Sequence, residues 1–435
     1  MDAIRQAWSK SKWYRVALVA AILWFVLRFA VQVIYASGMM PELTGEDGLP
    51  MDVPVYLAGA QKFMAGQDLY PQDLSDSTFH YPYSPPFAML STVLLLFSPQ
   101  AVAIGGTFLS VVIYALLYVK WMQIFERLSL PGVVEKMALT LPVWLIFSAF
   151  WGLVAYLNIG IFVALVATLL LEGILQERLK WSAALATFLL ISKLMWLFPL
   201  GLPLLVGRRK FFFRLLGLTA LFYAGLVGVS MLVAGPGYIL QQYADYIIHL
   251  QRIASEFPWH VRDTIPFLGY NHSIKQVFVF LLGTHPWVLG LAMLVKILML
   301  LPFGLLCWRL LRTHPAQDSH ALKLALVFCL YLAAFIWLDI VWEVLLGIAV
   351  FPFVLSILEK TWHKRLAWGL FLLYAFVDLI QLFSYIFGGD SLVVMQGAYV
   401  LSDPSLHLPL TMLVILMFYA FLLAYLRRTP DGQGA

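Results

Sequence analysis

The chain has little charge and almost no cysteine. Charged residues make up 12% of its 435 residues, about half the share typical of soluble domains, whereas hydrophobic residues reach 62%. Such a chain cannot cover itself with a polar surface in water, which excludes the soluble enzyme folds. Its two cysteines, Cys307 and Cys329, lie inside apolar runs, so no disulfide framework or cysteine metal site is available. No signal-peptide cleavage pattern precedes the first apolar run, so we expect that run to remain as a helix.

Motifs for nucleotides and metal ions are also missing. The nine histidines form no H-x-x-H or H-E-x-x-H pattern, so no metal site is signalled, although carboxylates alone leave a divalent metal open. There is no P-loop and no Rossmann glycine motif, and the loops rich in basic residues are short. We therefore expect no cofactor, no nucleic acid partner and no nucleotide-binding domain. Membrane lipids are the expected surroundings.

The apolar runs predict an all-α polytopic membrane protein. About thirteen runs qualify when about 20 residues are taken as one span, but 84–98, 181–192 and 194–207 are too short to cross alone. Short segments with proline are tolerated at membrane depth only where protein or a wet cavity covers their backbone. With both termini expected on the inner face, the number of crossings must be even, so one candidate does not span. We expect this to be 84–98, which leaves about twelve transmembrane helices.

Basic clusters set the predicted orientation. They flank the first span at 5–15 and recur at 208–214, 309–323, 360–365 and 427–428, which by the positive-inside rule makes these segments and both termini cytoplasmic. The acidic loop 37–83 and a second loop, 235–272, then lie on the outer face. We expect a single transmembrane domain over 1–428 and a cytoplasmic tail over 429–435.

The first outer loop, 37–83, carries the most informative pattern. Tyr56, Ala60, Phe63 and Met64 share one face at helical spacing, which predicts an amphipathic juxtamembrane helix over 53–65. Asp52 precedes it, and this position has two interpretations. An aspartate before a helix with proline in its first turn is a common N-cap. The second interpretation, less favoured on the sequence alone, is a carboxylate held beside a membrane cavity that acts as a general base.

An aromatic, proline-rich run, Phe79–Phe87, leads from this loop back into the membrane. The simplest interpretation is an interfacial belt. The alternative is a wall on which a sugar stacks. Tyr81 of this run and Tyr56 of the helix are therefore candidate substrate-binding residues.

Several segments together resemble glycosyltransferase family 87. They are D-x-x-V-Y-x-x-G-A at 52–60, A-G-Q-D-L-Y-P at 65–71 and Y-P-x-x-P-P-F-A at 81–88, followed by Asn158, by Lys193 in I-S-K-L-M-W-L-F-P, and by N-H-S at 271–273. The resemblance covers roughly residues 50–280. It departs from the family pattern at Ala155-Tyr156, where Gly-Gln is common, and at Glu343, which stands near a usual histidine.

This resemblance implies a GT-C-type helical bundle that takes a sugar, often mannose, from a polyprenyl-phosphate donor. An acidic residue in the first outer loop is then the expected base, which selects Asp52, with Asp47 as the fallback. The resemblance also makes substrate-binding candidates of Asn158, Lys193, Asn271 and Ser273.

Basic residues of the second outer loop are further candidates for contact with the donor phosphate. They are Arg252, His260 and Arg262. Asp339 and Glu343 fall at a later outer turn, where they are suited to bind an acceptor or a cation. Asp378 lies within an apolar run and must have a partner, which the sequence does not identify.

The predicted function is transfer of a sugar, with inversion, to a lipid or glycan acceptor on the outer face of the inner membrane. The main alternative is a lipid or glycan flippase without catalysis, which usually carries an internal repeat that is not visible here. A polysaccharide ligase or polymerase is a third hypothesis. It would be expected to have arginine or histidine in a large late outer loop, whereas 388–407 holds only His407.

Overall fold

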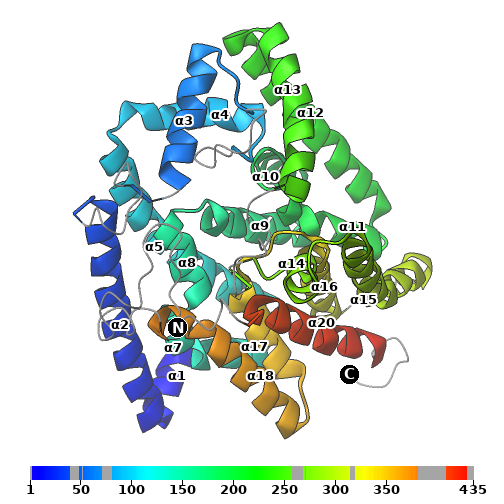
Figure 1. Ribbon diagram of the computed structural model, residues 1–435. Helices are drawn as coiled ribbons and strands as arrows, with labels where there is room; N and C mark the ends of the chain where they lie inside the picture. Colours follow the sequence, from blue (N-terminus) through cyan, green and yellow to red (C-terminus); the bar gives the residue numbers. More distant parts are fainter. Residues whose placement is uncertain are drawn as a thin grey trace.

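A computed structural model describes residues 2–39, 49–50, 52–70, 81–256, 268–269, 271–313, 319–380 and 408–428. Within these ranges the protein is all-helical, with 19 α-helices and two 3-10 helices (Figure 1). The all-α prediction is confirmed.

Six of the helices are long and apolar enough to cross a membrane. They are α2 (Lys12–Ala36), α5 (Pro99–Arg127), α12 (Arg209–Ala234), α15 (Pro286–Thr313), α16 (His320–Trp337) and α20 (Leu410–Arg428). A seventh span is formed if a bent run counts as one crossing. This run joins α6 (Pro131–Leu139) to α7 (Leu141–Leu145) and α8 (Ser148–Tyr156), with a bend of 52°. The chain is therefore a multi-pass membrane protein.

The remaining apolar runs form helices too short to be counted as spans. They are α4 (Pro85–Ser91) with the 3-10 helix η1 (Thr92–Leu96), α9 (Gly160–Leu175), α10 (Leu179–Ser192), η2 (Leu194–Leu200) with α11 (Gly201–Leu205), and α17 (Gly347–Ile357). At 1.5 Å per residue, even α9 reaches only about 24 Å, less than the hydrocarbon thickness of about 30 Å. The described residues thus show six or seven candidate spans where about twelve were predicted, because many apolar runs are broken into short helices.

The helices differ in how much of their surface the rest of the protein covers. Only 11% of the most apolar stretch of α12 is buried in the protein, against 61% of the corresponding stretch of α16. α9 and α17 are buried along almost their whole length. α9, α16 and α17 are therefore enclosed largely by other helices and form part of the core of the protein.

Five further helices complete the described fold. They are α1 (Asp2–Lys10), α3 (Asp52–Ala65), α13 (Pro236–Glu256), α14 (Ile274–Leu282) and α18 (Thr361–Ala375). α13 folds back along α12 after Gly235, whose φ of +90° suits glycine, and the Tyr223 and Tyr243 hydroxyl groups are 2.8 Å apart across the pair. α3 and α4 lie beside this hairpin at one end of the molecule, far from α1 in this view (Figure 1).

Candidate active site at the start of helix α3

Asp52 is the first residue of α3, in agreement with the predicted helix over 53–65. Val53 N–H donates to the Pro50 carbonyl at 3.0 Å, so the helix is entered through a tight turn. Three residues of the predicted face, Tyr56, Ala60 and Phe63, are buried as expected, whereas Met64 is 64% exposed. The Met64 side chain therefore projects away from the face that packs on the protein.

The Asp52 carboxylate is held by side chains. Asn158 Nδ2 donates to Oδ2 at 2.6 Å, and the Tyr56 hydroxyl donates to the same oxygen at 3.4 Å. Asp52 itself remains partly exposed. Besides starting the helix, as its sequence position predicted, Asp52 thus bonds to the side chains of Asn158 and Tyr56.

Asn158 is presented by a turn between α8 and α9, residues 157–159. Leu157 has the left-handed backbone (φ +52°) that few residues other than glycine adopt. The Asn158 backbone N–H donates to the Leu153 carbonyl at 2.8 Å, and its side-chain Oδ1 accepts from Gly160 N–H at 2.8 Å. Contacts within its own turn therefore fix the orientation of the side-chain amide independently of Asp52.

Lys193 completes the site from a third part of the chain. It lies in the extended break between α10 and η2, outside the six candidate spans, and its backbone N–H caps α10 through the Leu189 carbonyl. Its Nζ donates to Asn158 Oδ1 at 2.7 Å. One amide thus bridges a carboxylate and an ammonium group, and we call Asp52, Asn158 and Lys193 the Asp52 junction.

Burial changes the proton affinity of both charged groups of the Asp52 junction. Desolvation raises the pKa of Asp52 above its usual value, although Lys193 and the hydrogen bonds from Asn158 and Tyr56 oppose this shift. Desolvation lowers the pKa of Lys193 to about 8, against the charge of Asp52. Opposite shifts of this kind suit a general base next to a cation that binds an anion.

Comparison with known proteins decides the family. The sequence profile of glycosyltransferase family 87 matches residues 79–338, which is more than half of the 435 residues. The chain belongs to glycosyltransferase family 87. No curated protein and no solved structure matches significantly. Asn158 and Lys193 of this glycosyltransferase lie inside the matched range, and Asp52 lies before it.

Tyrosines surround Asp52 in this family 87 glycosyltransferase. The ring of Tyr83 lies 5.8 Å from that of Tyr56, and Tyr81 lies 5.5 Å from Tyr83. Tyr81 is fully buried against α3, where a Cβ on Gly59 would come within 2.5 Å of its ring. Tyr81 therefore packs tightly on α3, and glycine at position 59 is what permits this contact.

Asn271 and Ser273 hold backbone in place in the second half of the glycosyltransferase. Asn271 donates to the Asp339 carbonyl at 2.9 Å and accepts from Val341 N–H at 3.0 Å. Ser273 is the N-cap of α14 and accepts from Gln276 N–H at 3.1 Å. Asn271 therefore supports the segment that joins α16 to α17, and Ser273 caps the start of α14.

Asp339 and Glu343 of that joining segment have partners of their own. Asp339 pairs with Lys296 at 2.5 Å and with Lys275 at 3.3 Å, and we call these three residues the Asp339 cluster. Glu343 accepts from the Tyr374 hydroxyl at 2.7 Å. Sequence reasoning missed Lys275 and Lys296. Lys275 is the one basic residue of α14, and Lys296 lies in the apolar middle of α15, away from the arginines at its end, and this isolation was the available signal.

The remaining predicted residues are not brought to the Asp52 junction by the described contacts. Arg252 lies on α13 and is partly buried. His260, Arg262 and the fallback base Asp47 lie outside the described residues. The partner of Asp378 is now known to be Arg28 of α2, at 3.2 Å.

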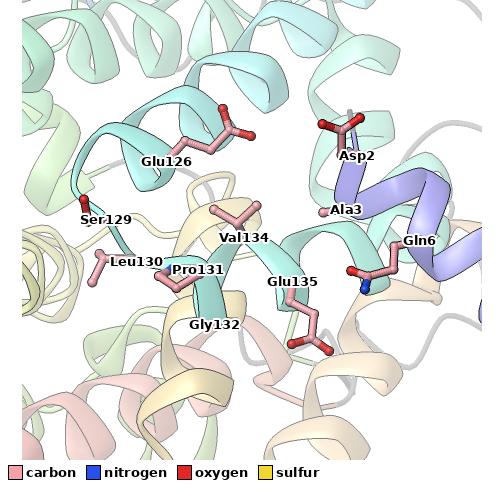
Figure 2. Close-up of a pocket in the computed structure, with 10 residues that line it drawn as sticks. All are labelled: Asp2, Ala3, Gln6, Glu126, Ser129, Leu130, Pro131, Gly132, Val134 and Glu135. Carbon is pink, nitrogen blue, oxygen red and sulfur yellow. The ribbon is translucent and has the colours of Figure 1, made fainter.

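A cavity of about 870 Å³ lies elsewhere, between α1 and the loop that joins α5 to α6 (Figure 2). Three acidic residues, Asp2, Glu126 and Glu135, are among its lining, and none of the ten lining residues is a predicted site residue. Within the described ranges, no group of three or more histidine, cysteine or acidic residues is arranged to hold a metal ion.

Proposed function

We propose that this glycosyltransferase moves a hexose, mannose in the first instance, from a polyprenyl-phosphate donor to a hydroxyl group of a lipid or glycan acceptor. The observation that supports this most is the Asp52 junction, where a partly exposed carboxylate and a lysine share one bridging amide. A lipid-phosphate sugar requires a cation for its phosphate and a base for the acceptor. Both kinds of group meet here beside apolar helices able to accept a lipid tail.

In the proposed reaction Asp52 accepts the proton of the acceptor hydroxyl as its oxygen attacks the anomeric carbon. The bond from that carbon to the phosphate oxygen breaks, and polyprenyl phosphate leaves with the electron pair. Lys193 stabilises the charge that develops on this phosphate. Attack opposite the leaving group inverts the anomeric configuration in one step. Asn158 keeps the base and the cation at a fixed separation.

The proposed topology follows the basic clusters. About twelve crossings, with both termini in the cytoplasm, bring α3 and the second outer loop to the outer face of the inner membrane. Arg252, His260 and Arg262 of that loop are proposed to contact the donor phosphate, and Asn271 and Ser273 to support the sugar through the backbone that they hold. Tyr56 and Tyr81 form the aromatic wall behind the base.

The test is sugar transfer in reconstituted membranes with wild type, Asp52→Asn and Asp68→Asn. Labelled polyprenyl-phosphate-mannose serves as donor and a membrane lipid extract as acceptor source. Asp68 is a matched control because it is exposed and belongs to the same outer loop, and its carboxylate accepts from Tyr70 N–H at 2.9 Å. We expect Asp52→Asn to lower transfer by about 10²–10⁴-fold, the usual effect of losing a general base, and Asp68→Asn to keep it.

Two other outcomes would change the proposal. Transfer that survives in a folded Asp52→Asn protein would reduce Asp52 to a structural residue of α3. Movement of the labelled lipid across the bilayer, without transfer from any of a panel of polyprenyl-phosphate sugars, would favour the flippase hypothesis.

A further inference from the structure

A chain of buried polar groups runs through α2, inside an otherwise apolar span. Arg28 and Gln32 are one helical turn apart and are 9% and 1% exposed. Arg28 Nε lies 3.2 Å from both carboxylate oxygens of Asp378, and Arg28 Nη1 donates to Gln32 Oε1 at 3.3 Å. Charged groups within a membrane span are costly and are retained where they serve a function.

This polar chain contacts α8 along its whole length. Gln32 Nε2 donates to the Val154 carbonyl at 3.0 Å near the end of α8. The Arg28 guanidinium lies over the ring of Trp151, 5.2 Å from its centre. At the start of α8, Ser148 Oγ accepts from Asp378 N–H at 2.8 Å. Residues 148, 151 and 154 lie three apart and so share one face of α8, and α2 and Asp378 contact this face.

The end of α8 that Gln32 contacts is also the end with a strained backbone. The Val154 carbonyl accepts from Leu157 N–H at 3.0 Å as well as from Gln32, at the point where Leu157 adopts its left-handed backbone. A non-glycine residue keeps such a conformation only where surrounding contacts determine it. Gln32 supplies those contacts from α2. Tyr56 supplies them from α3, accepting from Ile159 N–H at 3.0 Å.

We propose that Gln32 is a positioning residue for the sugar transfer: through the Val154 carbonyl it fixes the α8–α9 turn, and so the Asn158 amide that orients the Asp52 carboxylate. Arg28 and Asp378 fix Gln32 in turn. The amide has only one useful orientation, because its oxygen accepts from Arg28 while its nitrogen donates to α8. This inference rests on the proposed function, in which Asp52 is the base.

The pH profile distinguishes positioning from simple support of the fold. The groups that face Asp52 are Lys193, Asn158, Tyr56 and Tyr83, and of these Asn158 is the one carried by the turn. The Asn158 hydrogen bond favours the charged form of the carboxylate and holds its pKa down. A displaced turn loses that bond, the pKa of Asp52 rises, and the acid limb of the rate profile moves to higher pH.

The experiment compares Gln32→Leu with Gln276→Leu in the reconstituted transfer assay. Gln276 is a matched control, since it too is fully buried and donates its amide to a backbone carbonyl, that of Leu268 at 3.2 Å. For Gln32→Leu we expect kcat to fall about tenfold, KM for the donor to stay unchanged, and the acid limb to rise by about 0.5–1 pH unit. For Gln276→Leu we expect a lower Tm with the acid limb unmoved.

Arg28→Lys is the second variant, which keeps a cation beside Asp378 but loses the planar fork that also reaches Gln32. It should shift the acid limb in the same direction by a smaller amount. The proposal is overturned if Gln32→Leu and Arg28→Lys lower Tm while kcat and the acid limb stay at wild-type values. Asp52→Asn, measured in parallel, separates the two claims: if it retains transfer and the acid limb, the proposed base fails and the positioning inference fails with it.

Discussion

Two of the lysine–carboxylate sites among the described residues, the Asp52 junction and the Asp339 cluster, are built in opposite ways. In the Asp52 junction the amide of Asn158 stands between the charges, accepting from Lys193 and donating to Asp52. In the Asp339 cluster the charges bond to each other directly, and Lys296 also donates to the carbonyls of Trp337 and Leu338. All three residues of the junction are partly exposed, whereas Lys296 is 2% exposed.

The difference explains why we assign chemistry to one site and support to the other. The ammonium of Lys296 is saturated by three acceptors and closes the end of α16, where the helix dipole also favours a cation. In the Asp52 junction the amide of Asn158 stands between the two charges. This separation supports the proposed roles, in which the carboxylate accepts a proton and the ammonium binds a phosphate.

The largest expected effects come from replacing each lysine by methionine. Lys193→Met should lower transfer about 10²–10³-fold, as expected when a group that stabilises a developing anion is lost, with Tm close to wild type. Lys296→Met should instead lower the free energy of unfolding by about 3 kcal/mol, because Asp339 and two carbonyls lose a buried cation. Transfer assays and thermal unfolding on both proteins test this. The comparison fails if Lys296→Met loses transfer while remaining stable.

Replacing the bridging amide should have a smaller effect. Asn158→Leu removes the hydrogen bonds to Asp52 and Lys193, and bonds to charged groups contribute about 1.5–3 kcal/mol each. We expect transfer to fall about 10–100-fold, because Asp52 and Lys193 are then free to pair directly. Asn158→Asp is the control that keeps the side-chain shape. Its transfer rate at neutral pH should be lower than that of Asn158→Leu, because a second carboxylate then faces Asp52. Wild-type rates in a folded Asn158→Leu protein would contradict the role of the amide.

The pH dependence of kcat/KM should be bell-shaped, and kcat/KM should change about tenfold per pH unit along each limb. Asp52 is active when deprotonated and its pKa is raised by burial, so activity is lost as pH falls through a value above that of an ordinary aspartate. Lys193 is active when protonated, so activity is lost as pH rises through about 8. The alkaline limb should be absent in Lys193→Arg. An unchanged limb in that variant would assign it to another group.

The sequence predicted much of the Asp52 junction but little of its geometry. The order of Asp52, Asn158 and Lys193 follows from the family resemblance, and their types fit the chemistry. That one amide would bridge the other two depends on the left-handed Leu157 and on the break after α10, which apolar periodicity does not encode. Pairs formed between distant parts of the chain could not be predicted either, because Arg28 and Asp378 are 350 positions apart. Asn271 and Ser273 have ordinary capping patterns, but only Ser273 caps α14, whereas Asn271 holds the segment that joins α16 to α17.

The smallest expected effect compares two tyrosines with the same bonding pattern. Tyr56 accepts from Ile159 N–H at 3.0 Å and donates to Asp52 at 3.4 Å, and Tyr374 accepts from Val344 N–H at 2.9 Å and donates to Glu343 at 2.7 Å. Each hydroxyl group joins a backbone turn to a carboxylate. Loss of either should therefore cost the fold about 1 kcal/mol.

Their effects on transfer should differ. Tyr56→Phe should lower kcat a few-fold, at most about fivefold, because its contact with Asp52 is long and Asn158 still orients the base. It should also raise the acid limb slightly, since the hydroxyl group favours the charged carboxylate. Tyr374→Phe should lower Tm by a similar amount and leave the acid limb in place. If both variants moved the acid limb equally, Glu343 would share the proton chemistry with Asp52, and the distinction between the two regions would have to be abandoned.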